Sequence, residues 1–355
     1  MKIAVIGAGN GGQALAGYLA SIGNEVIVSE LNQTIVDVLR TKGGIQLEGK
    51  INAYGKLAGV TCDATEAIKG AELIMVATTA TAHASLAKQL SNSLEEGQTI
   101  ILNPGRTGGA IEFRKVLLDN GFDKRIYLAE AQTLVYACRL KTHGSVNIIG
   151  IKDKVYLSGL PASDTKYIID KISPFFNCFM PCKNVLVTSL ENYGAVFHPS
   201  IVLFNAAAIE RGSNFYFYRE MTPCIADFLD RLDAERVAVG KAYGIEMIRA
   251  KDWVSFAYDN IQGDTLCERL KSNPAYYDIL APGKIDCRQI TEDIPTGAVP
   301  LLAFGKAAGL EMPLYTSLVG ICSALLNTDF NKTGRSLERL GLKNRNREEI
   351  LAEIQ

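Results

Sequence analysis

The sequence predicts an N-terminal α/β domain with a doubly wound parallel sheet, followed by a C-terminal all-α domain. A chain of 355 residues exceeds the usual size of a single core, so two domains are expected. Short apolar runs alternate with helical patterns in the first half, which is typical of a parallel sheet. From Leu190 onward helical periodicity dominates. We therefore expect domains at 1–186 and 187–355, with the boundary in the segment 183–189.

The first expected strand, Lys2–Ile6, stops at the turn Gly7-Ala8-Gly9-Asn10-Gly11-Gly12, and helical spacing of apolar residues follows. A second strand, Glu25–Val28, leads to Glu30, 23 positions after Gly7. This order indicates a Rossmann domain that binds a nicotinamide dinucleotide: a strand, a glycine-rich turn, a helix, a second strand and an acidic residue. The alternative is a degenerate Rossmann domain that has lost its ligand.

The residues of this unit have separate expected roles. Gly7 permits the turn, Gly9 lets the backbone approach a pyrophosphate, and Gly12 allows helix and strand to pack closely. Glu30 would accept hydrogen bonds from the adenosine ribose, and its charge would repel a 2′-phosphate, so we expect NAD. NADP stays possible, because Lys42 could reach a phosphate if the chain folds back.

Further strands are expected at Leu73–Ala77, Thr99–Leu102 and Ile126–Leu128. Ligands of doubly wound sheets bind beyond the carboxyl ends of the strands, where Thr78 and Asn103-Pro104-Gly105 follow the first two. These residues either contact the cofactor or serve as ordinary loops. The candidates for cofactor binding are Gly7, Gly9, Asn10, Gly12, Glu30, Thr78, Asn103 and Gly105.

Helices are expected throughout the second half. Thr222-Pro223 is typical of a helix start, with an N-cap followed by proline at the first helical position. Two more helices are expected at Pro300–Ala308 and Pro313–Leu326. The last is almost entirely apolar, so we expect it to be buried, either within the chain or at the interface of a homodimer.

Composition excludes several classes of function. A formal net charge of -1 offers no excess of positive charge for a nucleic acid. No apolar stretch approaches the length of a membrane span, and the N-terminus lacks the pattern of a signal peptide. Scattered cysteines, with no second pair near Cys178 and Cys182, indicate free thiols in the cytoplasm and no metal site.

His198 stands out in the second half, because it lies in an otherwise apolar stretch before Pro199. A histidine can transfer protons near neutral pH, but a lone histidine on an apolar face is often a hydrogen-bonded core residue. The residues around it leave both interpretations open.

A set of motifs carries a more specific signal than the Rossmann pattern alone. They are Gly7-Ala8-Gly9-Asn10-Gly11-Gly12, Asn103-Pro104-Gly105-Arg106-Thr107-Gly108-Gly109, Phe197-His198-Pro199, Asn273-Pro274-Ala275-Tyr276 and Glu292-Asp293-Ile294-Pro295-Thr296-Gly297-Ala298-Val299-Pro300. In these motifs the chain resembles the octopine/nopaline (opine) dehydrogenases over nearly its whole length. It is most similar to the bacterial branch that makes N-(1-carboxyethyl) (norvaline-type) amino acids.

The resemblance implies an activity and three residue roles. The family uses NAD(P)H to condense a 2-oxo acid, such as pyruvate, with the amine of an L-amino acid, and it also runs the reverse reaction. By this resemblance His198 and Asp293 form a catalytic dyad. Arg288, five positions before Asp293, would hold the carboxylate of the oxo acid. Glu30 departs from the branch, which has aspartate there.

Two other functions remain as alternatives. The first is a 2-oxo acid or ketopantoate-type reductase, but such enzymes rely on a helical-domain lysine, and none lies between Lys183 and Lys241. The second is a regulatory protein that binds NAD without turnover. A large separation of His198 from Asp293 would favour it.

Overall fold

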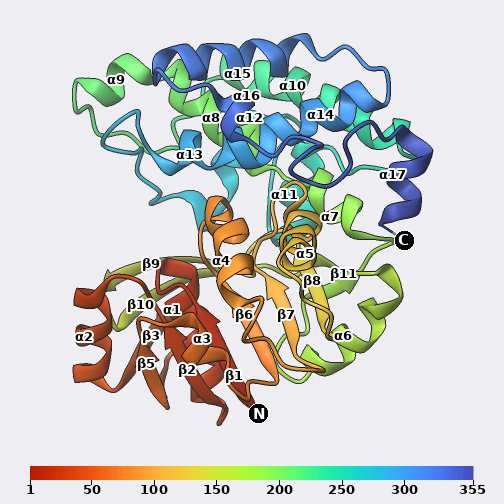
Figure 1. Cartoon of the computed structure of the whole chain (residues 1–355). Coiled ribbons are helices and arrows are strands. Elements are labelled where there is room, and N and C mark those ends of the chain that lie inside the picture. The colour runs from red at the N-terminus through yellow and green to blue at the C-terminus, as the bar shows by residue number, and fades with distance from the viewer. Residues whose placement is uncertain (355) are drawn as a thin grey trace. The chain divides into compact units, whose positions relative to one another are not determined.

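The computed structural model describes residues 1–354, and we describe its two compact units separately. Unit 1 comprises Met1–Gly105 and Gly109–Val185, and unit 2 comprises Arg106–Gly108 and Leu186–Ile354. Within residues 1–354 the named strands all lie in unit 1, and unit 2 consists of helices, turns and loops with an isolated β-bridge between Tyr216 and Leu280 (Figure 1). The predicted combination of a Rossmann-like α/β domain with an all-α domain is therefore confirmed.

The main sheet of unit 1 has eight strands in the order β12-β11-β8-β7-β6-β1-β2-β5. Six strands from β5 to β8 run parallel, while β11 is antiparallel to β8. The sheet is thus doubly wound and parallel except at one edge. The strands are β1 (Lys2–Ile6), β2 (Glu25–Ser29), β5 (Gly59–Thr61), β6 (Leu73–Val76), β7 (Thr99–Leu102), β8 (Tyr127–Ala131), β11 (Val155–Leu160) and β12 (Phe179–Pro181).

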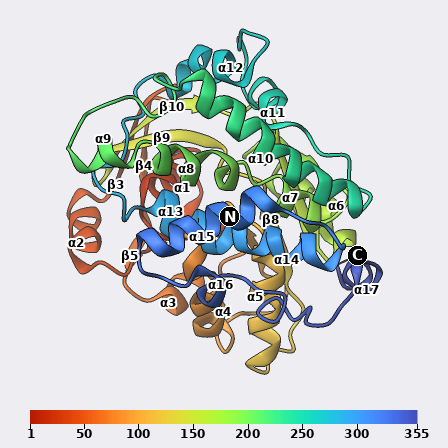
Figure 2. The same ribbon diagram turned by 90° about the horizontal axis from the view of Figure 1, so that it is seen from above.

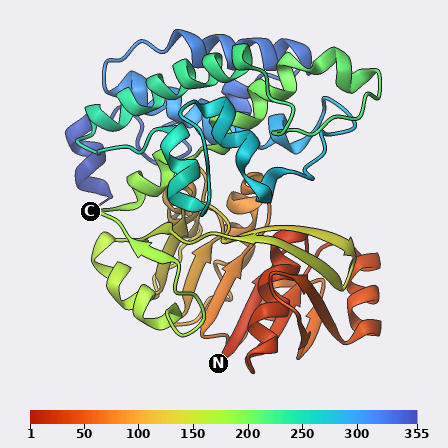
Figure 3. The same ribbon diagram turned by 180° about the vertical axis from the view of Figure 1, so that it is seen from behind.

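A second sheet of four strands, which we did not expect, packs on α1 with the order β4-β3-β10-β9. Its members are β3 (Gly44–Gly49), β4 (Ala53–Lys56), β9 (Tyr136–Thr142) and β10 (Ser145–Ile151). The long β9–β10 hairpin is visible from behind in Figure 3. Its strands alternate between buried and partly exposed residues, so no continuous apolar run marks them.

Six helices connect the strands of unit 1. The carboxyl ends of β1, β6 and β7 are neighbours in the parallel sheet, so the turns that leave them lie at one edge. The helices are α1 (Asn10–Ser21), α2 (Gln33–Lys42), α3 (Ala64–Ile68), α4 (His83–Leu90), α5 (Gly109–Asp119) and α6 (Thr165–Ile172).

Unit 2 is built around α8, α10, α14 and α15, and α14 and α15 lie side by side in Figure 2. The predicted N-cap of α10 is present, since Thr222 Oγ1 accepts a hydrogen bond from the backbone N–H of Ile225. The helices are α8 (Gly194–Phe204), α9 (Ala206–Glu210), α10 (Pro223–Ala242), α11 (Ala250–Ala257), α12 (Leu266–Ser272), α13 (Arg288–Thr291), α14 (Val299–Ala307), α15 (Pro313–Leu325), α16 (Phe330–Thr333) and α17 (Arg347–Glu353), with α7 (Val185–Leu190) beginning at the boundary.

The chain itself buries only one face of the apolar helix α15, so complete burial within the chain, one of the two expected alternatives, is wrong. Tyr315, Leu318 and Val319 are buried, but Ile321 is 51% and Leu325 44% exposed. The buried face of α15 packs on α8, α10, α14, α16 and the turn Ile294–Ala298. None of the helices in residues 1–354 has both the length and the apolar character needed to cross a membrane.

Candidate functional site

The glycine-rich turn of unit 1 begins where β1 ends. Gly7 has a positive φ of 95° and donates its N–H to the Ser29 carbonyl on β2. A methyl group on Gly12 would overlap the Gly7 carbonyl oxygen, so helix α1 can approach β1 only with glycine there. A methyl group on Gly9 would meet nothing within 4 Å. The space above Gly9 is therefore open to a ligand.

Glu30 holds the turn through its carboxylate. Its Oε2 accepts a hydrogen bond of 2.8 Å from the Ala8 N–H, and Oε1 accepts one of 3.0 Å from the Asn32 N–H. Lys42, the candidate for contacting a 2′-phosphate, donates instead to the Thr142 hydroxyl and the His143 carbonyl. The Glu30 carboxylate thus faces the glycine-rich turn, whereas the Lys42 ammonium group is bound at the β9–β10 turn.

Asn10 and Gln13 connect the start of α1 to the second sheet. Asn10 Oδ1 accepts a 2.8 Å hydrogen bond from the Leu140 N–H on β9. The buried Gln13 side chain donates to the Ala8 carbonyl and accepts from the Gly144 N–H in the β9–β10 turn. The hairpin thus supports the glycine-rich turn, a connection that the sequence pattern did not indicate.

Thr78, Asn103 and Gly105 follow β6 and β7 at the same edge of the sheet as the turn. Thr78 Oγ1 and Asn103 Oδ1 are buried and make no hydrogen bond with any residue in 1–354. Buried oxygens without partners are unfavourable, so a ligand with hydrogen-bonding groups fits beside them. Together with the open space at Gly9, these oxygens fit a bound dinucleotide.

The second cluster of predicted residues lies within unit 2. His198 Nδ1, on α8, lies 2.7 Å from Oδ2 of Asp293, which precedes the π-helical turn Ile294–Ala298. Asp293 is fully buried, whereas the His198 side chain is 22% exposed. Gly297 in this turn allows close packing on α8, since a methyl group there would lie 2.7 Å from Ala195 Cβ. Such π-helical turns often occur at functional sites.

The other ring nitrogen of His198 is also occupied. His198 Nε2 lies 2.9 Å from the Tyr218 hydroxyl. Tyr218 is itself held by stacking on Tyr276, with ring centroids 4.4 Å apart, and Phe217 packs edge-on against the imidazole. The imidazole therefore has a carboxylate on one side and a hydroxyl on the other, within an aromatic wall.

A buried arginine shares the Asp293 carboxylate with His198. Arg106 Nη1 lies 3.3 Å from Asp293 Oδ1. Burial raises the pKa of Asp293, but the charge of Arg106, the charge and hydrogen bond of His198 and the charge of Arg288 outweigh it. They hold the pKa of this carboxyl below its ordinary value. Asp293 is therefore ionised at neutral pH.

Arg288, the predicted carboxylate-binding residue, is the first residue of α13. It lies five positions before Asp293, and its charge contributes to the low pKa of that carboxyl. Its side chain is 59% exposed and its Nε lies 3.3 Å from Glu292 Oε2. An exposed guanidinium can reach a carboxylate in solution, in contrast to Arg106, whose side chain is only 10% exposed.

The sequence patterns above assigned no role to Arg106 or Tyr218. Arg106 belongs to one of the motifs quoted above, but its chain neighbours β7 and α5 lie in unit 1, so no local pattern assigns it to Asp293. Tyr218 lies in the aromatic run Phe215-Tyr216-Phe217-Tyr218, in which nothing distinguishes one ring from the next.

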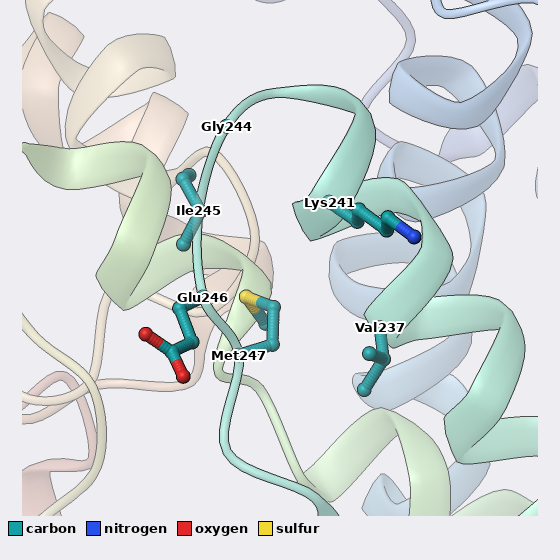
Figure 4. Close-up of a pocket in the computed structure, with 6 residues that line it drawn as sticks. All are labelled: Val237, Lys241, Gly244, Ile245, Glu246 and Met247. Carbon is teal, nitrogen blue, oxygen red and sulfur yellow. The ribbon is translucent and has the colours of Figure 1, made fainter.

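A hollow of about 380 Å³ in unit 2 holds none of these residues. It lies between the end of α10 and the segment that follows, as Figure 4 shows. Its lining residues are Val237, Lys241, Gly244, Ile245, Glu246 and Met247. The hollow is therefore separate from both clusters of predicted residues.

Comparisons with known proteins agree with the two-part architecture. Residues 181–326 match the family model of the NAD/NADP octopine/nopaline dehydrogenase α-helical domain. Residues 2–102 match the model of the coenzyme F420-dependent NADP oxidoreductases.

Among curated proteins, the opine dehydrogenase of Arthrobacter sp. (strain 1C) is 37% identical over 346 residues, which cover 96% of this chain and 94% of that protein. The octopine dehydrogenase of Mizuhopecten yessoensis is 25% identical, covering 90% of this chain and 88% of that protein.

Two solved structures share the fold across the whole chain. Octopine dehydrogenase with NADH and L-arginine has a TM-score of 0.78 at 22% identity, covering 98% of this chain and 97% of that one. Yersinopine dehydrogenase with NADP⁺ has a TM-score of 0.74 at 13% identity, covering 99% and 98%. With the close bacterial relative, these matches show that the chain belongs to the octopine/nopaline (opine) dehydrogenase family and is an NAD(P)-dependent oxidoreductase.

Proposed function

We propose that this chain condenses a 2-oxo acid, such as pyruvate, with the amine of an L-amino acid and reduces the product to a secondary amine dicarboxylate, and that it also catalyses the reverse reaction. Residues 1–186 hold the dinucleotide, and residues 187–355 carry the proton-transfer chemistry. The observation that carries the proposal is the 2.7 Å contact between His198 Nδ1 and Asp293 Oδ2 in an opine dehydrogenase family member.

The dinucleotide is held by the turn and the strand ends of unit 1. Gly7, Gly9 and Gly12 give the pyrophosphate access to the start of α1, and Asn10 supports the turn. Glu30 accepts from the adenosine ribose and disfavours a 2′-phosphate, so NAD is the preferred coenzyme. Thr78, Asn103 and Gly105 complete the site beyond the strand ends. When bound, the coenzyme supplies the hydride.

His198 supplies and accepts the proton of the reaction. Condensation of the oxo acid with the amine releases water and forms an imine, and its reduction adds a hydride and a proton overall. Asp293 holds Nδ1, so Nε2 is the nitrogen that exchanges a proton with the substrate. Positioned proton transfer of this kind contributes about 10²–10⁴-fold to a rate.

Arg288 binds the carboxylate of the oxo acid. Both substrates carry carboxylates, and a guanidinium matches two carboxylate oxygens with two parallel N–H groups. The exposure of Arg288 and its position five residues before Asp293 support this role. The nearby Glu292 carboxylate partly balances the charge of Arg288 until the substrate binds.

The exposed apolar face of α15 forms the interface of a homodimer. This face includes Ile321 and Leu325, and a glycine at position 320 has open space above it. Sedimentation of a single species at the mass of one chain would contradict the dimer.

The enzyme acts in the cytoplasm. The absence of disulfides among the cysteines of residues 1–354 is consistent with a reducing compartment. Recovery of the activity from the membrane or periplasmic fraction of cells, instead of the cytosolic fraction, would contradict this location.

The test measures NADH oxidation with pyruvate alone and then with each common L-amino acid in turn. Oxidation that requires both substrates, with the secondary amine identified by mass spectrometry, supports the proposal and names the amine. Oxidation with the oxo acid alone indicates a simple 2-oxo acid reductase. No oxidation with any pair, despite tight NADH binding, supports the regulatory alternative.

A further inference from the structure

Arg106 occupies a buried position that the proposed reaction does not yet use. Its Nη1 lies 3.3 Å from Asp293 Oδ1 and 3.3 Å from Asn192 Oδ1, and its Nε lies 3.9 Å from Glu292 Oε1. It is therefore the closest buried cation on the face of Asp293 opposite His198. Arg106 Nη1 donates a hydrogen bond to Asn192 Oδ1, whereas Nε makes no hydrogen bond within residues 1–354.

The backbone of Arg106 is held in an unfavourable conformation. Its φ is 60°, in the left-handed region that side chains other than glycine rarely adopt. The next residue fixes this geometry from several sides: the Thr107 N–H donates to the Thr296 carbonyl, and the Thr107 hydroxyl donates to the Ser189 carbonyl. Strain that the surroundings maintain in this way is typical of functional positions.

The start of α8 leaves room for the ion pair. A methyl group on Gly194 would overlap Arg106 Nη1 and lie 2.8 Å from Asp293 Oδ1. The same helix carries His198 one turn later. The helix that positions the imidazole is thus shaped to let the guanidinium contact the carboxylate behind it.

The charges explain why a permanent cation is useful there. Asp293 is fully buried, and a buried carboxylate without a partner is strongly disfavoured. If His198 were its only partner, loss of the imidazole proton would leave the negative charge of Asp293 without a compensating cation. Burial alone would lower the pKa of Arg106, but Asp293, Glu292 and Tyr218 raise it, so the guanidinium stays charged.

On the basis of the proposed function, we propose that Arg106 is a positioning residue of the reaction: its permanent charge keeps Asp293 ionised in both protonation states of His198, so that the imidazole can release and regain its proton.

Other charged and titratable groups also surround the dyad. Arg288 and Glu292 lie on or beside α13, Cys287 precedes it, and Tyr218 contacts the imidazole. From α10, Arg236 lies over the ring of Tyr193 at the start of α8 and pairs with Asp233 and Glu191. Helix α15 contributes no charged residue. Among the cations in this set, Arg106 is the one in direct contact with Asp293.

The test is an NMR titration of the His198 imidazole, which needs no substrate and so stays valid if the proposed reaction is wrong. The chain has only three histidines, so His198→Gln assigns the signal and the other two serve as references. Arg106→Met should raise the midpoint of the His198 titration by about one pH unit, a tenfold change in proton affinity. Arg106→Lys, which keeps the charge, should restore the wild-type midpoint.

Two further variants complete the design. Asn192→Asp places a second carboxylate beside Arg106 and should raise the midpoint in the same direction, which keeps the test decisive if Arg106→Met does not fold. Lys343→Met removes an exposed cation outside the site, so the midpoint should stay near that of the wild type. In the active enzyme, the pH profile of kcat/KM should move to higher pH in the variants that raise the His198 midpoint and stay in place in those that do not. A His198 midpoint unchanged in the folded Arg106→Met or Asn192→Asp variant would overturn the proposal.

Discussion

The Tyr218 hydroxyl lies 2.9 Å from His198 Nε2, the ring nitrogen opposite the one that Asp293 holds. We therefore expect Tyr218→Phe to lower kcat about two- to tenfold, the loss that one hydrogen bond explains. The stack on Tyr276 needs only the ring, so the variant should melt like the wild type. Tyr277→Phe, which removes an exposed hydroxyl nearby, is the control. Equal rates in the two variants would show that the contact with His198 does not matter in turnover.

His198→Ala should reduce turnover by about 10²-fold or more while NADH affinity stays nearly unchanged. The reason is that the imidazole belongs to unit 2, whereas the glycine-rich turn belongs to unit 1. Ser200→Ala is the matched control, because Ser200 is buried on the same helix and its hydroxyl makes no hydrogen bond within residues 1–354. Steady-state kinetics and NADH fluorescence titration separate the two effects. Wild-type turnover in His198→Ala would refute the proton-transfer role.

Asp293→Asn should abolish most activity and also reduce stability, because it leaves Arg106 buried with less negative charge around it. Loss of one partner of a buried ion pair costs about 3–5 kcal/mol. The pKa of Asp293 is lowered from 3.8 in the folded state, so its contribution is complete above that pH and is lost as the pH falls below it. The difference in Tm between wild type and variant should thus be constant near neutral pH and narrow in acid.

The exposed pair Asp252 and Arg269 provides the control for this measurement. Asp252→Asn should change stability by about 1 kcal/mol or less, since solvent screens surface pairs. A neutral-pH Tm for Asp293→Asn equal to that of Asp252→Asn would contradict the buried ion pair.

Gly9→Ala and Gly12→Ala should fail in different ways. A methyl group on Gly9 meets nothing within 4 Å, so this variant should fold and melt normally but bind NADH at least tenfold more weakly, because the methyl group occupies the space of the pyrophosphate. A methyl group on Gly12 overlaps the Gly7 carbonyl, so this variant should lose about 1–3 kcal/mol or more of stability. Calorimetry and thermal melting distinguish them. Normal NADH binding by Gly9→Ala would argue against this turn as the nucleotide site.

Glu30→Gln should weaken the preference for NADH over NADPH. The amide keeps the size of the side chain and can still accept a hydrogen bond, but it no longer repels a 2′-phosphate. The ratio of kcat/KM values for the two coenzymes measures the effect, and Glu25→Gln, at the start of the strand that Glu30 follows, is the control. An unchanged ratio would show that another group sets the preference.

Local patterns predicted residues 2–29 well, because β1, its turn, α1 and β2 are consecutive in the chain. The second sheet was missed because its strands are amphipathic, and β3 is bounded by glycines at both ends, Gly44 and Gly49. The sequence did not show which face of α15 the chain itself covers, because an apolar helix does not reveal what lies against each of its faces.

In the candidate site, too, local patterns were informative and contacts set by tertiary packing were not. His198 and Asp293 are 95 positions apart, and only the resemblance to a family brought them together before the structure placed them in contact. Arg106 was missed because its partner is determined by tertiary packing, and the elements that flank it in the chain, β7 and α5, belong to unit 1.

The tripeptide Arg106–Gly108 belongs to the helical unit although β7 and α5 flank it in the chain. A chimera that replaced residues 1–185 of this chain would therefore also replace Arg106 while keeping His198 and Asp293. To keep the arginine with its aspartate, residues 106–108 have to be exchanged together with the helical unit.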